Sequence, residues 1–100
     1  MAHSLLLLLN VTLKIETIRS NAGTIIKLIG RIRGESLAGL RAQIQGSEMV
    51  IALEMDEVTL VDLDVVRFLV ACESEGIELR GCPPYIRQWI VQEHKAAIHD

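Results

Sequence analysis

At Glu54-Met-Asp-Glu-Val-Thr-Leu-Val-Asp62-Leu-Asp-Val-Val-Arg-Phe-Leu69 the chain passes from a strand into a helix. The apolar run Met49–Leu53 leads into this stretch, and it is too short for a buried helix, so it predicts an interior strand. An acidic turn follows, and Asp62 is a favoured N-cap residue. A helix N-terminus at the carboxyl end of a strand is where open α/β sheets usually place their binding surface.

Two further strands are expected upstream. Residues Val11–Ile18 alternate apolar and polar side chains, as a half-buried strand does, and Thr24–Gly30 form a second apolar run. The short turn-forming segment Ser20–Gly23 joins them, which predicts an antiparallel hairpin. Gly34 then ends the hairpin. Over Glu35–Gln45 the spacing of the apolar residues changes from that of a strand to that of a helix.

Downstream, the helix that begins at Asp62 ends near Gly76. A short strand is expected over Gly76–Gly81, and Pro83 and Pro84 suit the first turn of a last helix. The predicted core-facing residues of the three helices are Leu37, Leu40, Ile44, Val65, Phe68, Leu69, Cys72, Ile86, Trp89 and Ile90.

The predicted order is therefore β-β-α-β-α-β-α. Because strands linked through helices lie parallel, this order predicts one α/β domain with an open mixed sheet of four strands and helices mainly on one face. We expect residues 1–100 to form this single domain, with its core at 11–93 and mobile ends at 1–4 and 94–100.

Composition excludes several classes of function. The formal net charge is −3 and the basic residues are scattered singly, so we expect no nucleic-acid partner. Leu5–Leu9 is too short for a signal peptide or a membrane span, which predicts a soluble, cytoplasmic protein.

Catalytic and metal motifs are also missing from the sequence. No phosphate-binding glycine loop follows any expected strand. The histidines, His3, His94 and His99, fall in segments expected to be mobile. The two cysteines lack metal-ligand spacing. We therefore expect no catalytic residue, no metal and no cofactor. One alternative stays open at the acidic edge, which is formed by Asp56, Glu57, Asp62 and Asp64. These four carboxylates could hold Mg²⁺ for receiver-like phosphoryl transfer, or the edge could bind a small ligand.

The stretch Glu54-Met-Asp-Glu-Val-Thr-Leu-Val-Asp62 is similar to the Asp-Leu-x-x-Val-x-Phe-Ile-Asp segment of STAS domains, the family of bacterial anti-sigma-factor antagonists and sulfate-transporter tails. The β-β-α-β-α-β-α order resembles that fold. Gly30 matches the Gly-x-Leu motif that ends its second strand, and Gly76-Ile-Glu-Leu fits the strand after its second helix. The resemblance covers roughly residues 11 to 93 and implies a non-catalytic regulatory module with an anti-sigma factor or related protein as partner.

Two positions depart from the family pattern. In the bacterial antagonists a phosphorylatable serine follows the aspartate and a glycine follows two residues later, whereas here Leu63 and Val65 occupy these positions. A leucine accepts no phosphate, so we expect no phosphorylation at the helix start. Thr59 is a weak alternative candidate, which more readily belongs to the connection between strand and helix.

We expect a partner to bind the loop over Glu54–Val61 and the helix start behind it. Leu63 would be an exposed apolar anchor, although it could instead fold over the strand end. The expected partner-binding residues are Asp62, Leu63, Asp64, Val66, Arg67 and Glu57. Separately, the apolar segment ahead of the first strand predicts a homodimer through residues 5–18.

Overall fold

The computed structural model describes residues 13–99, and the side chains of residues 13–96. They form one α/β domain with a four-stranded mixed sheet, in the predicted order. The elements are β1 (Leu13–Arg19), β2 (Thr24–Ile32), the short 3₁₀ turn η1 (Gly34–Ser36), α2 (Leu37–Gln45), β3 (Val50–Val61), α3 (Leu63–Ser74), β4 (Glu78–Arg80) and α4 (Pro84–His99).

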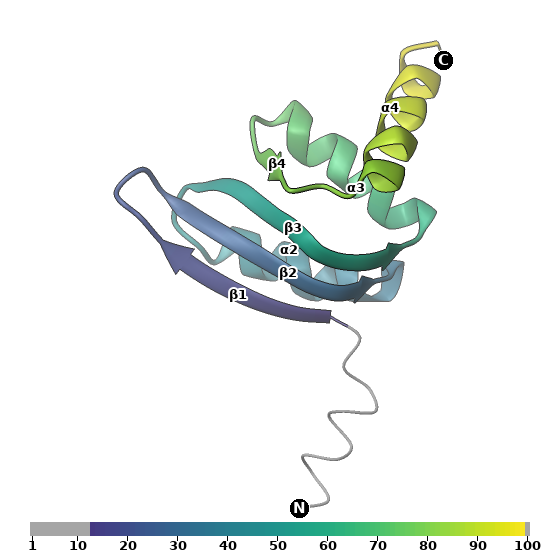
Figure 1. The fold of residues 1–100 in the computed structure, drawn as a ribbon. Helices are drawn as coiled ribbons and strands as arrows, with labels where there is room; N and C mark the ends of the chain where they lie inside the picture. The colour runs from purple at the N-terminus through teal and green to yellow at the C-terminus, as the bar shows by residue number, and fades with distance from the viewer. Residues whose placement is uncertain (1–12, 100) are drawn as a thin grey trace, which may run out of the picture.

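The strands lie in the order β1-β2-β3-β4 (Figure 1). β1 pairs antiparallel with β2, whereas β2–β3 and β3–β4 pair parallel. Both parallel connections step across the sheet in the same direction, and right-handed crossovers then place α2 and α3 on the same face. α4 packs against α3. This agrees with the predicted architecture.

The core lies between this helix-covered face and the helices. The buried side chains include Ile26, Leu28 and Ile32 of β2, Leu53, Met55, Val58 and Val61 of β3, and Leu37, Leu40, Val65, Val66, Phe68, Leu69, Cys72, Leu79, Ile86 and Ile90. Ile44 and Trp89, also expected in the core, are only partly buried against it. The aliphatic stripes predicted from helical spacing therefore form the core.

β3 is much longer than predicted. The prediction of an acidic turn over Glu54–Val61 is wrong, because these residues continue the strand to Val61. The pairing of β3 with β2 shifts register three times, and each shift is a β-bulge or similar irregularity. Met55, Val58 and Val61 are consequently buried at a spacing of three, which hides the two-residue alternation of a strand.

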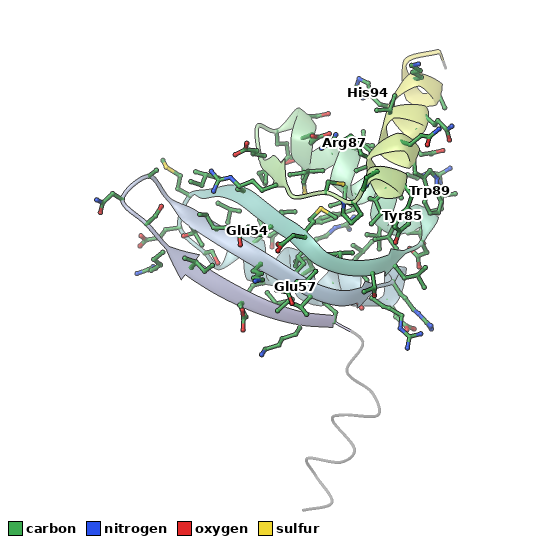
Figure 2. All side chains as sticks on the ribbon, viewed as in Figure 1. Glu54, Glu57, Tyr85, Arg87, Trp89 and His94 are labelled. Atoms are coloured by element: carbon green, nitrogen blue, oxygen red, sulfur yellow. The ribbon has the colours of Figure 1, made fainter. Side chains whose placement is uncertain are left out.

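The sheet face opposite α2 and α3, the open face, carries paired charges. Lys27 lies between Glu16 of β1 and Glu54 of β3 in the strand register. Its Nζ lies 2.7 Å from Oε2 of Glu57. The hydrogen bond and the charge of Glu57 raise the pKa of Lys27 above its ordinary value. Figure 2 shows Glu54 and Glu57 on the sheet.

α4 continues past the predicted end of the core at residue 93 and runs to His99. His94, expected in a mobile end, is therefore helical. Within the described part of the chain, no helix combines the length and apolar character that crossing a membrane requires.

Two glycines in different surroundings provide a test of the packing. Gly23 has φ +150°, and a Cβ there would lie 2.6 Å from the carbonyl oxygen of Met49. Gly39 lies inside α2 with nothing within 4 Å of such a Cβ. We expect Gly23→Ala to lower the free energy of unfolding by about 2 kcal/mol, and Gly39→Ala to raise it by about 0.5–1 kcal/mol. Urea denaturation of both variants measures this. A similar effect of the two changes would contradict the packing of the β1–β2 turn against Met49.

Candidate functional site

The candidate site lies where β2 and β3 end and where η1 and α3 begin. We define the carboxyl-edge patch as the exposed residues Arg31, Leu60, Leu63, Asp64, Arg67 and Tyr85. Arg31 and Leu60 are register partners at the ends of β2 and β3. The helix start expected at the carboxyl end of a strand is thus present.

Asp62 holds this edge together. One of its carboxylate oxygens, Oδ1, accepts a hydrogen bond of 3.1 Å from the backbone N–H of Val65, as the predicted N-cap requires. Its other oxygen, Oδ2, accepts a hydrogen bond of 2.8 Å from the N–H of Gly34. A single side chain therefore fixes both the start of α3 and the turn that follows β2.

Gly34 also lies close to the second aspartate of this edge. A Cβ on Gly34 would be 2.9 Å from Oδ2 of Asp64 and 3.3 Å from its Cβ. The absence of a side chain at Gly34 lets the η1 turn approach the first turn of α3. The exposed Asp64 carboxylate also lies in that first turn, where the helix dipole favours a negative charge.

Leu63 is exposed at the first position of α3. Its relative exposure is 37%, so it is partly exposed and does not belong to the buried core. Leu60 and Tyr85 are more exposed, at 47% and 48%. A leucine at this helix position cannot reach the apolar stripe on which Val65 and Leu69 lie, because it points to a different side of the helix.

Val66 was expected in the partner-binding group, and this prediction is wrong. Its side chain is 0% exposed and belongs to the core. The buried face of α3 is wider than a narrow stripe, because adjacent residues Val65 and Val66 both face inward, as do Phe68 and Leu69. A side chain in this position cannot contact a partner while the domain stays folded.

The other predicted residues separate into two places. Asp62, Asp64 and Arg67 lie around Leu63 at the start of α3, where Arg67 Nε donates a 3.2 Å hydrogen bond to Glu93 of α4. Glu57 instead lies on the open face of β3, opposite Ile29 and paired with Lys27. The structure therefore does not place Glu57 beside the helix start.

Tyr85 is a surface residue of this edge that the sequence interpretation missed. Its hydroxyl donates a 2.5 Å hydrogen bond to the carbonyl oxygen of Thr59 and so joins α4 to the end of β3. Figure 2 shows Tyr85 in the first turn of α4, beside that strand end. Its position directly after Pro83 and Pro84 gives no signal by itself, because Ile86 in the same turn is 0% exposed.

The four carboxylates of the acidic-edge alternative do not converge. Asp56 and Glu57 are exposed residues of β3, whereas Asp62 and Asp64 begin α3, and both oxygens of Asp62 accept backbone hydrogen bonds. Among residues 13–99, no group of three or more His, Cys, Asp or Glu side chains is arranged to hold a metal ion.

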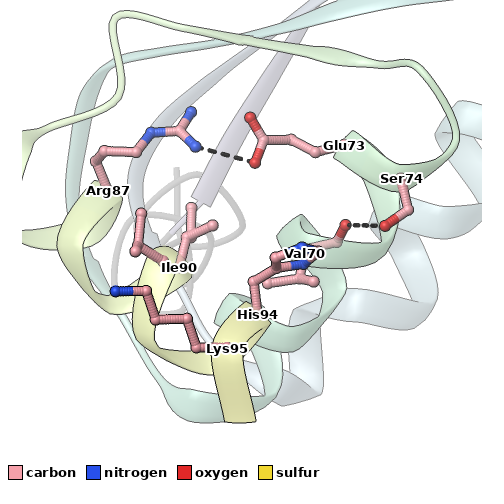
Figure 3. Close-up of a pocket in the computed structure, with 8 residues that line it drawn as sticks. Val70, Glu73, Ser74, Arg87, Ile90, His94 and Lys95 are labelled. Carbon is pink, nitrogen blue, oxygen red and sulfur yellow. Dashed lines mark hydrogen bonds and ion pairs between the residues drawn. The ribbon is translucent and has the colours of Figure 1, made fainter. Parts of the chain in front are cut away.

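A shallow cavity of about 290 Å³ lies between α3 and α4. Val70 and Ile90 form its apolar floor, and His94 and Lys95 line one side (Figure 3). Across the opening, Arg87 Nη1 donates a 2.9 Å hydrogen bond to Glu73. The guanidinium is thus already paired, and the cavity is at the lower end of the size of small-molecule sites.

No protein-family model matches this chain, and no curated protein matches it either.

The thiols give a prediction that depends on pH. Burial raises the pKa of Cys72 to about 11, helped by the charge of Glu75, and burial also raises the pKa of Cys82. The position of Cys82 before a helix start therefore does not produce a thiolate. We expect both thiols to react with iodoacetamide at pH 8 more slowly than free cysteine, measured by mass spectrometry. Because an unfolded thiol has a pKa of about 8.5, the contribution of Cys72 to stability is complete below that pH and is lost as pH rises towards 11. Rapid alkylation of Cys72 in the folded protein would contradict its burial.

Replacing Asp62 tests whether it holds the edge together. Asp62→Ala removes both acceptors, and we expect it to lower the free energy of unfolding by about 2 kcal/mol. Asp62→Asn keeps one oxygen acceptor but places an amide NH₂ against the second N–H, so about half of this loss is expected. Urea denaturation measures both, and Asp64→Ala provides a control because Asp64 makes no side-chain cap bond to α3. A cost for Asp62→Ala no larger than that of the control would show that the two hydrogen bonds do not stabilise the fold.

Proposed function

We propose that this chain is a non-catalytic protein-interaction module, similar to the STAS domains of bacterial regulatory proteins, that works in the cytoplasm. The observation that carries the proposal is the exposed Leu63 at the start of α3, within the carboxyl-edge patch. Support also comes from the element order and from the N-cap Asp62 that directly follows β3.

The patch has the composition of a protein-binding surface. Its apolar members, Leu60, Leu63 and Tyr85, are accompanied by charged side chains that include Arg31 and Arg67. Apolar and aromatic side chains with a polar rim are typical of the centre of protein interfaces. Small-molecule sites are concave instead, and no residue of this patch lines the cavity between α3 and α4.

The patch is also held in place before any partner binds. Asp62 fixes the first turn of α3, and the hydrogen bond from Tyr85 to the Thr59 carbonyl fixes the first turn of α4. Binding groups that are already ordered lose less conformational entropy when a partner docks. This order lowers the entropic cost of docking at the patch.

We propose that the binding is not switched by phosphate at the helix start. Phosphorylation acts by adding about −1.5 to −2 charges. Leu63 occupies the position where the bacterial anti-sigma-factor antagonists, which this chain resembles, carry a serine. By this resemblance the partner is an anti-sigma factor or a related regulator. Phosphorylation of the exposed Thr59 stays a prediction. The Mg²⁺-dependent alternative is weaker, because Asp62 already uses both oxygens within the fold.

Replacing Leu63 with lysine tests the proposal. We expect Leu63→Lys to reduce capture of the native partner from source-cell lysate at least tenfold, because the apolar anchor is lost. The free energy of unfolding should change by no more than about 0.5 kcal/mol, because the residue is exposed. Quantitative mass spectrometry of the captured proteins and urea denaturation measure the two effects.

Met49→Lys is the matched control, because Met49 is an exposed apolar residue that precedes β3, at the opposite end of that strand. This variant should capture the same partner as the unaltered chain. Unchanged capture by Leu63→Lys would refute the docking role of the patch. A stability loss of several kcal/mol would show that Leu63 packs as a core residue.

A further inference from the structure

The two edges of the sheet differ in their protection against pairing with another strand. β4 forms one edge, is only three residues long, and is followed by Gly81 and two prolines. Short strands and prolines prevent further pairing. β1 forms the other edge and has seven residues in continuous register with β2, without a bulge, glycine or proline. Within the described residues, β1 lacks these two protections, so its charged side chains decide how a second strand can pair with it.

The side chains of Leu13–Glu16 in β1 alternate between the two faces, and the exposed Ile18 follows on the open face. Leu13 and Ile15 lie on the helix-covered face, where they are half-buried against the core cluster. Lys14 and Glu16 lie on the open face, and Lys14 Nζ is 3.3 Å from Oε2 of Glu16. The edge therefore presents partly exposed apolar groups on one face and one positive and one negative charge on the other.

We propose that β1 is a self-association edge, at which two copies of this chain pair antiparallel about Ile15 and join their sheets into one. In this register Ile15 faces Ile15 of the second copy. Lys14 faces Glu16 of the second copy, and Glu16 faces its Lys14. The two-fold symmetry thus produces two cross-strand pairs of opposite charge, an arrangement that stabilises antiparallel strands.

Other registers satisfy these side chains less well. Centring the pair on Glu16 or on Lys14 places like charges directly opposite each other, which destabilises a sheet. Centring it on Thr17 leaves Glu16 opposite Ile18. A shift by a single residue turns the apolar side chains of one copy to the open face of the other. The Ile15 register alone matches both the charges and the faces.

This inference is independent of the carboxyl-edge patch and of its partner. It concerns part of the homodimer segment predicted from the sequence, residues 5–18. Residues 5–12 lie outside the described residues, and the proposed pairing uses only Leu13–Thr17 of β1.

Charge reversal tests the register directly. Sedimentation velocity of the full chain over a range of concentrations should show a monomer–dimer equilibrium. Lys14→Glu and Glu16→Lys should each weaken the dimer by about tenfold or more, because each variant puts like charges opposite each other twice. An equimolar mixture of the two variants should restore the dimer, because every cross-strand pair then has opposite charges. The double variant Lys14→Glu/Glu16→Lys should also dimerise.

Glu78→Lys provides the control, because it makes the same charge change in an exposed ion pair on the opposite edge. It should leave the dimer unchanged, and circular dichroism should show that each variant folds. The proposal is overturned if the unaltered chain is monomeric at every concentration. It is overturned equally if the single reversals stay dimeric, or if their mixture does not dimerise.

Discussion

The arrangement of the carboxyl edge depends on the carboxylate of Asp62. Two backbone segments begin at this edge, η1 after β2 and α3 after β3, and each starts with N–H groups that have no partner within their own element. Asp62 accepts hydrogen bonds from one N–H in each segment, at Val65 and at Gly34. An unpaired, partly buried N–H costs about 1–3 kcal/mol, so this side chain makes the close approach of the two segments stable. The exposed position of Leu63 follows directly, because the residue after the cap lies at the first position of the helix.

The second constraint is the irregular pairing of β3. Its register shifts against β2 insert residues that have no partner, while the ladder continues to Val61. Each insertion changes which side chains face outward, and Asp56 and Glu57 are therefore both exposed although they are consecutive. The last shift, between Gly30 and Arg31, places Leu60 at the surface beside Arg31. Bulges are common next to functional sites because they redirect side chains without ending the strand, and here they create part of the carboxyl-edge patch.

Local signals in the sequence predicted most of the fold, and non-local contacts account for the differences. The N-cap at Asp62 and the helical spacing of Val65, Leu69 and Cys72 depend on neighbouring residues, so the sequence shows them directly. The length of β3 depends on hydrogen bonds to β2, which sustain a strand through an acidic segment that alone resembles a turn. The burial of Val66 depends on how widely the strands and α4 surround α3. The link from Tyr85 to Thr59 joins residues 26 positions apart, and no local pattern indicates it.

The charges on the open face have a different role from those of the carboxyl edge. Lys14, Lys27 and Arg80 each lie within 3.3 Å of a carboxylate on the same face. Surface ion pairs of this kind add little to stability. They do, however, keep the face hydrated, and they oppose a shift of register, because a one-residue slip would carry these charges into the core. The charges of these pairs therefore nearly cancel at short range. At the carboxyl edge, by contrast, Leu60 and Leu63 remain exposed next to charged side chains, so burial of apolar surface would supply the free energy of docking there.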